Sequence, residues 1–271
     1  MTNEELAHRG LVLLGCGKMG SAMLEGWLAR GLPASSVWVL DPNPSEWVKN
    51  QHTHLNAPLP PNPAVVLIAV KPQMMGEALP SLQALGNSDT LFVSIAAGTT
   101  LQTLETTLGD RSPIIRSMPN TPAAIGKGIT AIIGNAHATP AHLDSTEDLL
   151  SGIGQVVRLE TEAQIDAVTG VSGSGPAYVF HMIECLAQAG QAQGLSAELA
   201  MQLAKATVSG AGALAMSASE DPAQLRVNVT SPNGTTQAGL EVLMNEDNGL
   251  GPLIDKTVAA ASDRSRELAR G

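Results

Sequence analysis

Two short stretches of this 271-residue chain carry residue types and spacings that could do chemistry. The first is Gly15-Cys16-Gly17-Lys18-Met19-Gly20, with glycine at its first, third and last positions. The second is Ser231-Pro232-Asn233-Gly234-Thr235-Thr236, a tight turn with two hydroxyls, followed by a helical pattern over Gln237–Met244. A turn that opens a helix presents unpaired backbone N–H groups and the positive end of the helix dipole, so each stretch suits an anion.

The second stretch has two interpretations when it is taken alone. One is a binding site for a small anion at the start of a helix. The other is an ordinary turn in which a Thr caps the helix, as in many helical domains. The six residues do not decide between them, so the rest of the chain must supply the context.

The first stretch lies in the context that a dinucleotide site requires. Leu11–Leu14 is a short, wholly apolar run, typical of a parallel strand that is buried on both faces. A helical pattern follows over Met19–Arg30, and a second strand over Val37–Leu40 ends at Asp41. The glycines would form the turn, admit the pyrophosphate and let the helix pack on the strand, while the acid meets the adenine ribose.

Asp41 also bears on which dinucleotide binds. A carboxylate favours the ribose diol of NADH and repels the 2′-phosphate of NADPH. No Arg or Lys occurs over residues 42–48 to neutralise such a phosphate, although Asn43 and Ser45 could donate hydrogen bonds. The alternative is that Asp41 only caps the loop at Pro42. The residues therefore favour NADH without excluding NADPH.

Further apolar runs predict an open α/β sheet with a ligand at its carboxyl edge. They are residues 65–70, 91–95, 114–117, 129–134 and 156–159. Several of them end in small or special residues, and a flat ring can lie close to backbone there. Lys71 follows one of these runs, either as a cation that faces the cofactor or as a solvated strand end.

The period of the pattern changes after about Thr161, where strand runs stop and long helical patterns begin. The segment 177–193 is apolar on more than one face, and 197–219 is rich in Ala, Gly and Ser. Two such helices lack enough partners within their own segment, which favours an intersubunit interface over burial against the first domain. We expect a Rossmann-type dinucleotide-binding domain over residues 1–160 and an all-helical domain for dimerisation and substrate binding over 161–271.

Composition narrows the classes of function. The net charge of −10 argues against nucleic acid or a membrane surface as a partner, and the chain has the 44% apolar content of a globular protein. The six histidines form no constellation, and the two cysteines imply neither a disulfide nor a metal site. No signal peptide, long apolar run or hydrolase motif is apparent, so we expect a soluble, cytoplasmic protein without a metal.

The ordered motifs resemble those of the pyrroline-5-carboxylate reductase family over nearly the whole chain, from Leu11 to about Leu268. They are Ala69-Val70-Lys71-Pro72, Ser94-Ile95-Ala96-Ala97-Gly98, Arg116-Ser117-Met118-Pro119-Asn120-Thr121-Pro122, Gly170-Val171-Ser172-Gly173-Ser174-Gly175-Pro176-Ala177-Tyr178 and Ser231-Pro232-Asn233-Gly234-Thr235-Thr236. The resemblance implies hydride transfer from NAD(P)H to the C=N carbon of 1-pyrroline-5-carboxylate, which yields L-proline. It also implies a homodimer of interlocking helices, often assembled into larger rings of dimers.

The resemblance assigns the site residue by residue. The cofactor residues are Gly15, Cys16, Gly17, Lys18, Met19, Gly20, Asp41, Val70, Lys71, Pro72, Ala96, Ala97, Asn120 and Asn228. The substrate residues are Ser231, Asn233, Gly234, Thr235 and Thr236. Backbone N–H groups around Gly234 and Thr235 would bind the substrate carboxylate, and the hydroxyl of Thr236, the one catalytic side chain, would bind the ring nitrogen.

The chain departs from the family pattern at two positions. The family usually has Gly where this chain has Asn233, which therefore must adopt a backbone geometry that Asn tolerates better than most residues. An acid commonly stands where this chain has Val227. Neither departure removes a group that is assigned to chemistry.

Two other functions compete with this one. A β-hydroxyacid dehydrogenase would carry a catalytic Lys, and an Asn four residues later, in the helix after the second glycine-rich turn. Residues 178–184 here have neither. A cofactor-binding regulatory or scaffold protein without turnover is the second alternative, and the intact stretch 231–236 argues against it.

Overall fold

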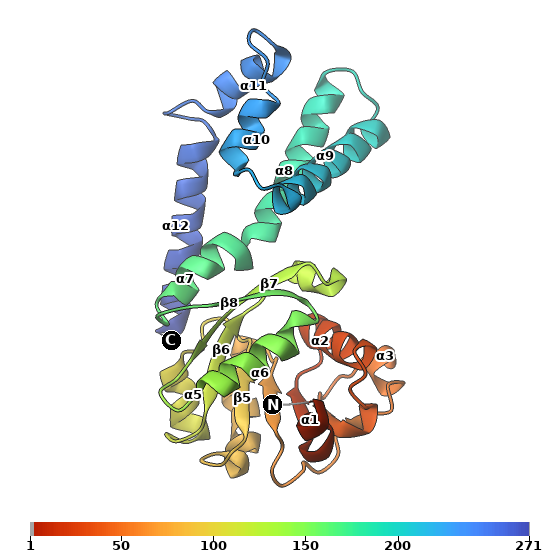
Figure 1. Cartoon of the computed structure of the whole chain (residues 1–271), viewed down its shortest axis with the longest axis vertical. Helices are drawn as coiled ribbons and strands as arrows, with labels where there is room; N and C mark the ends of the chain where they lie inside the picture. Colours follow the sequence, from red (N-terminus) through yellow and green to blue (C-terminus); the bar gives the residue numbers. More distant parts are fainter. Residues whose placement is uncertain (1–2, 271) are drawn as a thin grey trace. The chain divides into compact units, whose positions relative to one another are not determined.

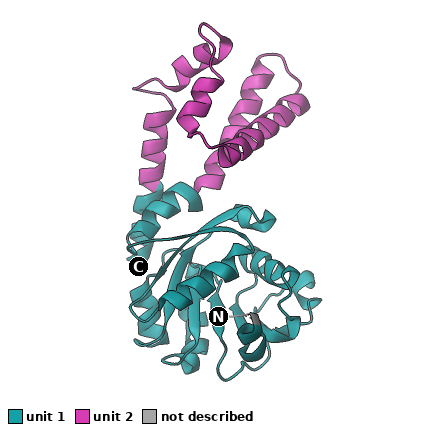
Figure 2. Ribbon diagram, viewed as in Figure 1, with its two compact units in different colours: residues 1–173, 261–271 teal, residues 174–260 magenta. Residues whose placement is uncertain are grey.

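The chain divides into two compact units in a computed structural model that describes residues 3–270. Residues up to Gly173, together with those from Ala261 onward, form the first unit, and Ser174–Ala260 form the second (Figure 2). The boundary between the two compact units thus lies beyond residue 160. The C-terminal segment from Ala261 belongs to the first unit. One contact there joins Ser265 to Asp166, whose side chains are hydrogen-bonded at 2.7 Å. The domain boundary at 160 and 161 stays a prediction.

The first unit is built on one eight-stranded sheet with the order β3-β2-β1-β4-β5-β6-β7-β8. Its strands are β1 (Leu11–Leu14), β2 (Val37–Leu40), β3 (His54–Leu55), β4 (Val65–Ile68), β5 (Leu91–Ser94), β6 (Ile114–Met118), β7 (Gly128–Gly134) and β8 (Gly154–Arg158). In this order, the strands β3, β2, β1, β4, β5 and β6 are mutually parallel. The strand β7 is antiparallel to β6, and β8 is parallel to β7. The predicted Rossmann-type architecture is confirmed.

Helices cover both faces of this sheet (Figure 1). Every residue of β1 and β4 is buried, and alternate residues enter one of two apolar clusters. One cluster includes side chains of α2 and α6, and the other includes side chains of α4, η3 and α5. This is why these strands are continuous apolar runs, since neither face meets water.

The α-helices of the first unit are α1 (Asn3–Arg9), α2 (Lys18–Ala29), α3 (Glu46–Lys49), α4 (Met75–Ala78), α5 (Leu101–Leu108), α6 (Pro140–Ser151) and α7 (Gln164–Val168). Those of the second unit are α8 (Gly175–Ala192), α9 (Ala197–Ser217), α10 (Pro222–Asn228) and α11 (Thr235–Leu243), while α12 (Leu250–Ala269) begins in the second unit and ends in the first. Short helical turns are η1 (Ala34–Ser36), η2 (Pro72–Met74), η3 (Leu79–Leu85), η4 (Thr121–Ile125) and the π-helical η5 (Thr169–Gly173).

Small residues let α8 and α9 approach closely in the second unit. Ala187, Ala200 and Ala204 form its small buried core, and a Cβ placed on Gly190 would lie 3.3 Å from the Cβ of Ala200. The same helices leave large apolar side chains exposed, among them Phe180, Leu186, Leu203, Leu214 and Met216. The predicted excess of apolar surface on these helices is confirmed for the isolated chain.

Three local features have no counterpart in the apolar pattern of the sequence. His54 lies in the two-residue strand β3, and its ring stacks on Trp38. The polar start of the chain forms the helix α1. The His181 side chain is exposed in this chain and contacts Glu184. None of the helices within residues 3–270 is both long and apolar enough to cross a bilayer.

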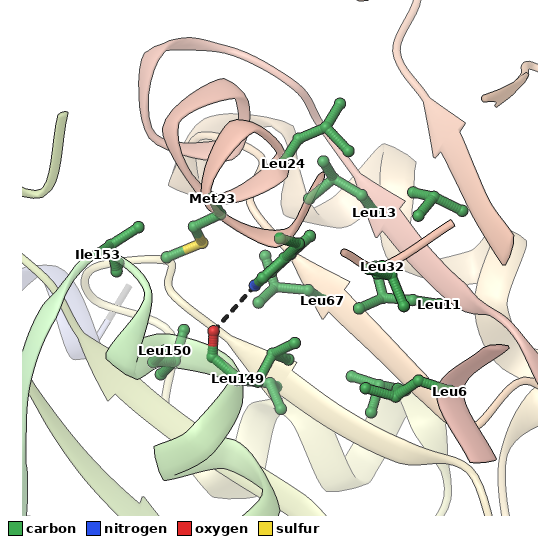
Figure 3. Packing of buried hydrophobic residues seen from close by; sticks show 14 of the residues in the cluster. Leu6, Leu11, Leu13, Met23, Leu24, Leu32, Leu67, Leu149, Leu150 and Ile153 are labelled. Carbon is green, nitrogen blue, oxygen red and sulfur yellow. Dashed lines mark hydrogen bonds between the residues drawn. The ribbon is translucent and has the colours of Figure 1, made fainter. Parts of the chain in front are cut away.

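Trp27 joins α2 to α6 in the interior of the first unit. Its indole N–H donates to the carbonyl oxygen of Leu149 at 2.9 Å, among the leucines shown in Figure 3. The Trp27 side chain is 3% exposed, so neither partner has water as a substitute.

Replacing Trp27 with Phe should therefore lower the free energy of unfolding by about 1–3 kcal/mol, because the buried carbonyl loses its donor. Urea unfolding followed by circular dichroism measures this change. Trp47→Phe is the matched control, because Trp47 is 37% exposed and its substitution should change the free energy by less than about 0.5 kcal/mol. Equal losses in the two variants would contradict the role given to the bond.

Candidate functional site

The glycine-rich loop joins the end of β1 to the start of α2. Gly15 has a φ of +89°, and a Cβ there would lie 2.9 Å from the backbone of Ala69 and Val70, at the end of β4. A Cβ on Gly20 would lie 2.5 Å from the carbonyl oxygen of Gly15. These two glycines are thus required by the close packing of backbone on backbone.

Gly17 differs, because the structure itself does not need a glycine there. Its φ of −70° is open to any residue, and no atom lies within 4 Å of the position that a Cβ would take. Among the described residues, the N–H groups from Gly17 to Gly20 have no hydrogen-bond partner. A row of free N–H groups beside open space fits the pyrophosphate of a dinucleotide.

Asp41 clamps this loop from the end of β2. Its carboxylate accepts the N–H of Cys16 at 2.7 Å and the N–H of Asn43 at 2.8 Å. Asn56 holds the backbone of Asp41 in turn, through both its amide oxygen and its amide nitrogen. Of the two predicted roles, the cap on the loop at Pro42 is therefore present, and the contact with the adenine ribose stays a prediction.

The Cys16 thiol lies inside the loop and is 4% exposed. Burial raises its pKa above the ordinary value, and the nearby Asp41 carboxylate acts in the same direction, although the Ser21 hydroxyl opposes the shift. A neutral thiol adds no negative charge beside the N–H groups of the loop.

The other predicted cofactor residues follow the carboxyl ends of parallel strands. Val70 comes after β4 and is partly buried, while Lys71 is exposed and precedes η2, which begins at Pro72. Ala96, buried, and Ala97, partly buried, come after β5. Because β1, β4 and β5 are parallel neighbours, these ends and the glycine-rich loop meet at one edge of the sheet. Whether Lys71 faces the cofactor stays a prediction.

Asn120, after β6, is already held by protein groups. Its amide nitrogen donates to the carbonyl oxygen of Ser172, and its amide oxygen accepts the N–H of Ile129. The side chain thus links the end of β6 to the start of β7 and to the π-helical turn before α8. These two hydrogen bonds involve only protein groups, and the contact of Asn120 with the cofactor stays a prediction.

A partly buried ion pair, which the sequence analysis did not single out, fixes the start of α5. Arg116 of β6 is 3% exposed, and its Nη1 donates to Oε1 of Glu162 at 2.7 Å. The same carboxylate oxygen accepts the N–H of Leu101, the first residue of α5. This pair holds the helix that follows the Ala96–Ala97 segment, and only the Arg116 side of it lay within a recognisable motif.

In the second unit, Ser231–Gly234 forms a turn that is closed by a hydrogen bond from the Gly234 N–H to the Ser231 carbonyl at 3.0 Å. Asn233 has a φ of +57°, which confirms the left-handed geometry expected of it. Because the Gly234 N–H is used inside the turn, the N–H groups left at the start of α11 are those of Thr235, Thr236 and Gln237. These have no partner within the part of the chain that the structure describes.

The starts of α2 and α11 differ from those of the other α-helices whose N-cap residue is extended. In α3, α5, α6, α9 and α10, a Ser, Thr or Asp side chain accepts a backbone N–H of the first turn. The N-cap residues of α2 and α11 are Gly17 and Gly234, which have no such side chain. Both helices therefore keep first-turn N–H groups and a positive dipole end available to a ligand.

Two observations complete the description of the site residues. The side-chain oxygen of Asn228, predicted near the nicotinamide ribose, accepts a hydrogen bond from Gln224 at 2.8 Å. No group of three or more His, Cys, Asp or Glu side chains within residues 3–270 could hold a metal ion.

Comparison with known proteins identifies relatives that cover nearly the whole chain. A family model described as "Pyrroline-5-carboxylate reductase dimerisation" matches residues 162–268, and one described as "NADP oxidoreductase coenzyme F420-dependent" matches residues 10–98. A pyrroline-5-carboxylate reductase of Pseudomonas aeruginosa is 39% identical over 265 residues, which cover 96% of either chain.

Solved structures agree with these matches. A pyrroline-5-carboxylate reductase from Coxiella burnetii superposes with a TM-score of 0.90 at 31% identity, covering 96% of this chain and 98% of that one. A pyrroline carboxylate reductase of Plasmodium falciparum, solved with NADP bound, gives a TM-score of 0.83 at 29% identity, covering 97% of this chain and 99% of that one.

The open space at Gly17 yields a test of the dinucleotide site. Gly17→Ala should leave the thermal unfolding midpoint within about 2 °C of the wild type, because the added methyl group meets no atom of the protein. It should raise the Kd for NADH at least about tenfold, because the methyl group would occupy the approach to the free N–H groups. Titration of NADH fluorescence measures the Kd.

Gly76→Ala is the control, because Gly76 lies in α4 and a Cβ there also meets nothing within 4 Å. It should leave the Kd unchanged, and any change in the midpoint should be an increase, because Ala favours the helix more than Gly does. Unaltered NADH binding by the Gly17 variant would show that the pyrophosphate does not lie on this loop.

Proposed function

The chain belongs to the pyrroline-5-carboxylate reductase family, and we propose that its two glycine-started helices divide the ligands, α2 binding the cofactor and α11 the substrate. The protein reduces 1-pyrroline-5-carboxylate to L-proline by hydride transfer from NAD(P)H, the last step of proline biosynthesis. The observation that carries the residue assignment is the uncapped start of α11, where an anion has N–H donors and no competing side chain.

The substrate carboxylate binds at the first turn of α11. The unpaired N–H groups of Thr235 and Thr236 donate to its oxygens, and the positive end of the helix dipole adds to the attraction. Ser231 and Asn233 contribute by shaping the turn, which Gly234 closes. The N–H of Gly234 is already bonded to the carbonyl of Ser231, so Gly234 acts by closing the turn.

The Thr236 hydroxyl orients the ring nitrogen. Its oxygen has no hydrogen-bond partner among the described residues, so both its donor and its acceptor capacity are available. Bound NAD(P)H supplies the hydride for the adjacent ring carbon. The nitrogen then needs one proton, which comes with a protonated substrate, from solvent or through the Thr236 hydroxyl. The protein's contribution is to set distance and orientation.

The cofactor lies on the loop from Gly15 to Gly20 and along the strand ends described above. Its remaining proposed contacts are Asp41, Val70, Lys71, Pro72, Ala96, Ala97, Asn120 and Asn228. The loop fits the pyrophosphate of the cofactor, because Gly17 leaves open space beside the free backbone N–H groups.

The helical unit serves association between copies of the chain. The dimerisation-family match and the exposed apolar side chains of α8 and α9 support a homo-oligomer. We propose a homodimer, with a larger ring of dimers as its further assembly, through the domain predicted over residues 161–271. A cytoplasmic location is part of the same proposal.

Removing the Thr236 hydroxyl tests the substrate assignment. Thr236→Ala should lower kcat/KM for 1-pyrroline-5-carboxylate by about one to two decades, because one hydrogen bond in the transition state is worth about 1–3 kcal/mol. The fall in NADH absorbance during turnover measures the rate. Thr236→Ser keeps the hydroxyl and should retain most of the activity. A Thr236→Ala enzyme with unchanged kcat/KM would remove Thr236 from the reaction.

The carboxylate of Asp41 leads to a prediction about cofactor choice. The first cation after it, Lys49, is paired with Glu46, so residues 42–49 offer no free cation to a 2′-phosphate. The wild type should have a lower KM for NADH than for NADPH, and Asp41→Ser should reduce this ratio at least about fivefold, which corresponds to ~1 kcal/mol. Steady-state assays with each cofactor measure both values. A wild-type KM for NADPH far below that for NADH would overturn the prediction.

A further inference from the structure

Resting on the proposed function, we propose that Gln237 is a positioning residue for the substrate-carboxylate turn, where it holds the left-handed backbone of Asn233 in the binding-competent form. Its side-chain oxygen accepts the N–H of Asn233 at 2.7 Å. Gln237 touches no reacting atom in this role. It acts on the turn that presents Thr235 and Thr236.

The turn needs such support because of the residue at its third position. The backbone bond from Gly234 to Ser231 closes a four-residue turn with Pro232 second and Asn233 third. A turn with Pro second and a positive φ third is of type II, which glycine fits without strain. Asn at a φ of +57° is tolerated but costs more than glycine would. The sequence of this turn therefore stabilises the type II geometry less than a glycine at the third position would.

Gln237 lies at the position from which a side chain can reach back over the helix start. It is the third residue of α11, after the N-cap Gly234. A Gln or Glu at this position ordinarily accepts the N–H of the N-cap residue. Here the Gly234 N–H is taken by Ser231, and Gln237 accepts the preceding N–H, that of Asn233. The bond spares the N–H groups assigned to the substrate.

A second bond fixes the orientation of the Gln237 amide. Its nitrogen donates to Oε1 of Glu241 one turn later, at 3.0 Å. With the nitrogen engaged there, the amide oxygen is the atom that faces Asn233. The series Glu241, Gln237 and Asn233 thus ties the body of α11 to the turn in front of it.

The consequence is an effect on substrate binding and not on the chemical step. Without the Gln237 oxygen, the exposed Asn233 N–H turns to water, and the turn populates other backbone states. The fraction that can bind the carboxylate falls, which raises the apparent KM by the inverse of that fraction. We expect Gln237→Ala to raise KM for 1-pyrroline-5-carboxylate about three- to tenfold, the range of one exposed hydrogen bond.

The test combines this variant with Asn233→Gly, because glycine adopts the left-handed geometry without help. Gln237→Ala should raise the substrate KM and leave kcat and the KM for NADH within about twofold of wild type. The KM of Asn233→Gly alone is the reference for the second comparison. Adding Gln237→Ala to Asn233→Gly should change the substrate KM by less than about twofold, so the two effects are not additive. Gln102→Ala, in the exposed first turn of α5, is the matched control and should change nothing.

Three outcomes would overturn the proposal. An unchanged substrate KM in Gln237→Ala is the first. An equal rise in KM in the Asn233→Gly background is the second, because Gln237 would then act by another route. Joint loss of kcat and NADH binding is the third, because it marks general structural damage. If Gln237→Ala does not fold, the comparison of Asn233→Gly with the double variant still decides the question. Failure of the proposed function shows separately, as a wild type that does not oxidise NADH with this substrate.

Discussion

The backbone N–H groups at the start of each helix need hydrogen-bond partners, and the rest of the structure depends on how this need is met. A helix leaves its first N–H groups without intrahelical partners, and a side chain, water or a ligand must satisfy them. This chain uses Ser, Thr or Asp caps at α3, α5, α6, α9 and α10, and glycine at α2 and α11. The two helices with a glycine N-cap start at the positions assigned to anions, the cofactor pyrophosphate and the substrate carboxylate. Each needs support from outside the helix, which Asp41 gives to the loop before α2 and Gln237 to the turn before α11.

The proposed assignment explains how a protein with a net charge of −10 can bind two anionic ligands. Neither binding segment relies on a cluster of basic side chains. Each relies on oriented N–H groups and a helix dipole, which act over a few ångströms and depend little on the charge of the whole molecule. The cost is geometric, because glycine or a left-handed residue must stand at each turn. Asn233 meets this requirement with a φ of +57°.

Local patterns allowed much of this to be predicted from the sequence. The buried strands appear as apolar runs, the glycine-rich loop lies between a strand and a helix, and the geometry of Asn233 follows from the glycine that the family usually has there. Features that depend on distant contacts could not be predicted. The bond from Cys16 to Asp41, the pair of Arg116 with Glu162 and the contact of Ser265 with Asp166 each join residues far apart in sequence. The strand β3 has two residues and no apolar run, so it carries no signal of its own. Gln237 has the composition of any helix surface, and only the structure shows its bond to Asn233.

The central claim is that the uncapped start of α11 binds the substrate carboxylate. A crystal structure of the protein with its product, L-proline, tests this most directly. The account predicts that the carboxylate oxygens lie within hydrogen-bonding distance of the backbone N–H groups of Thr235 and Thr236, with the ring nitrogen beside the Thr236 hydroxyl. A proline molecule whose carboxylate is held by other groups, with the first turn of α11 left to water, would contradict it.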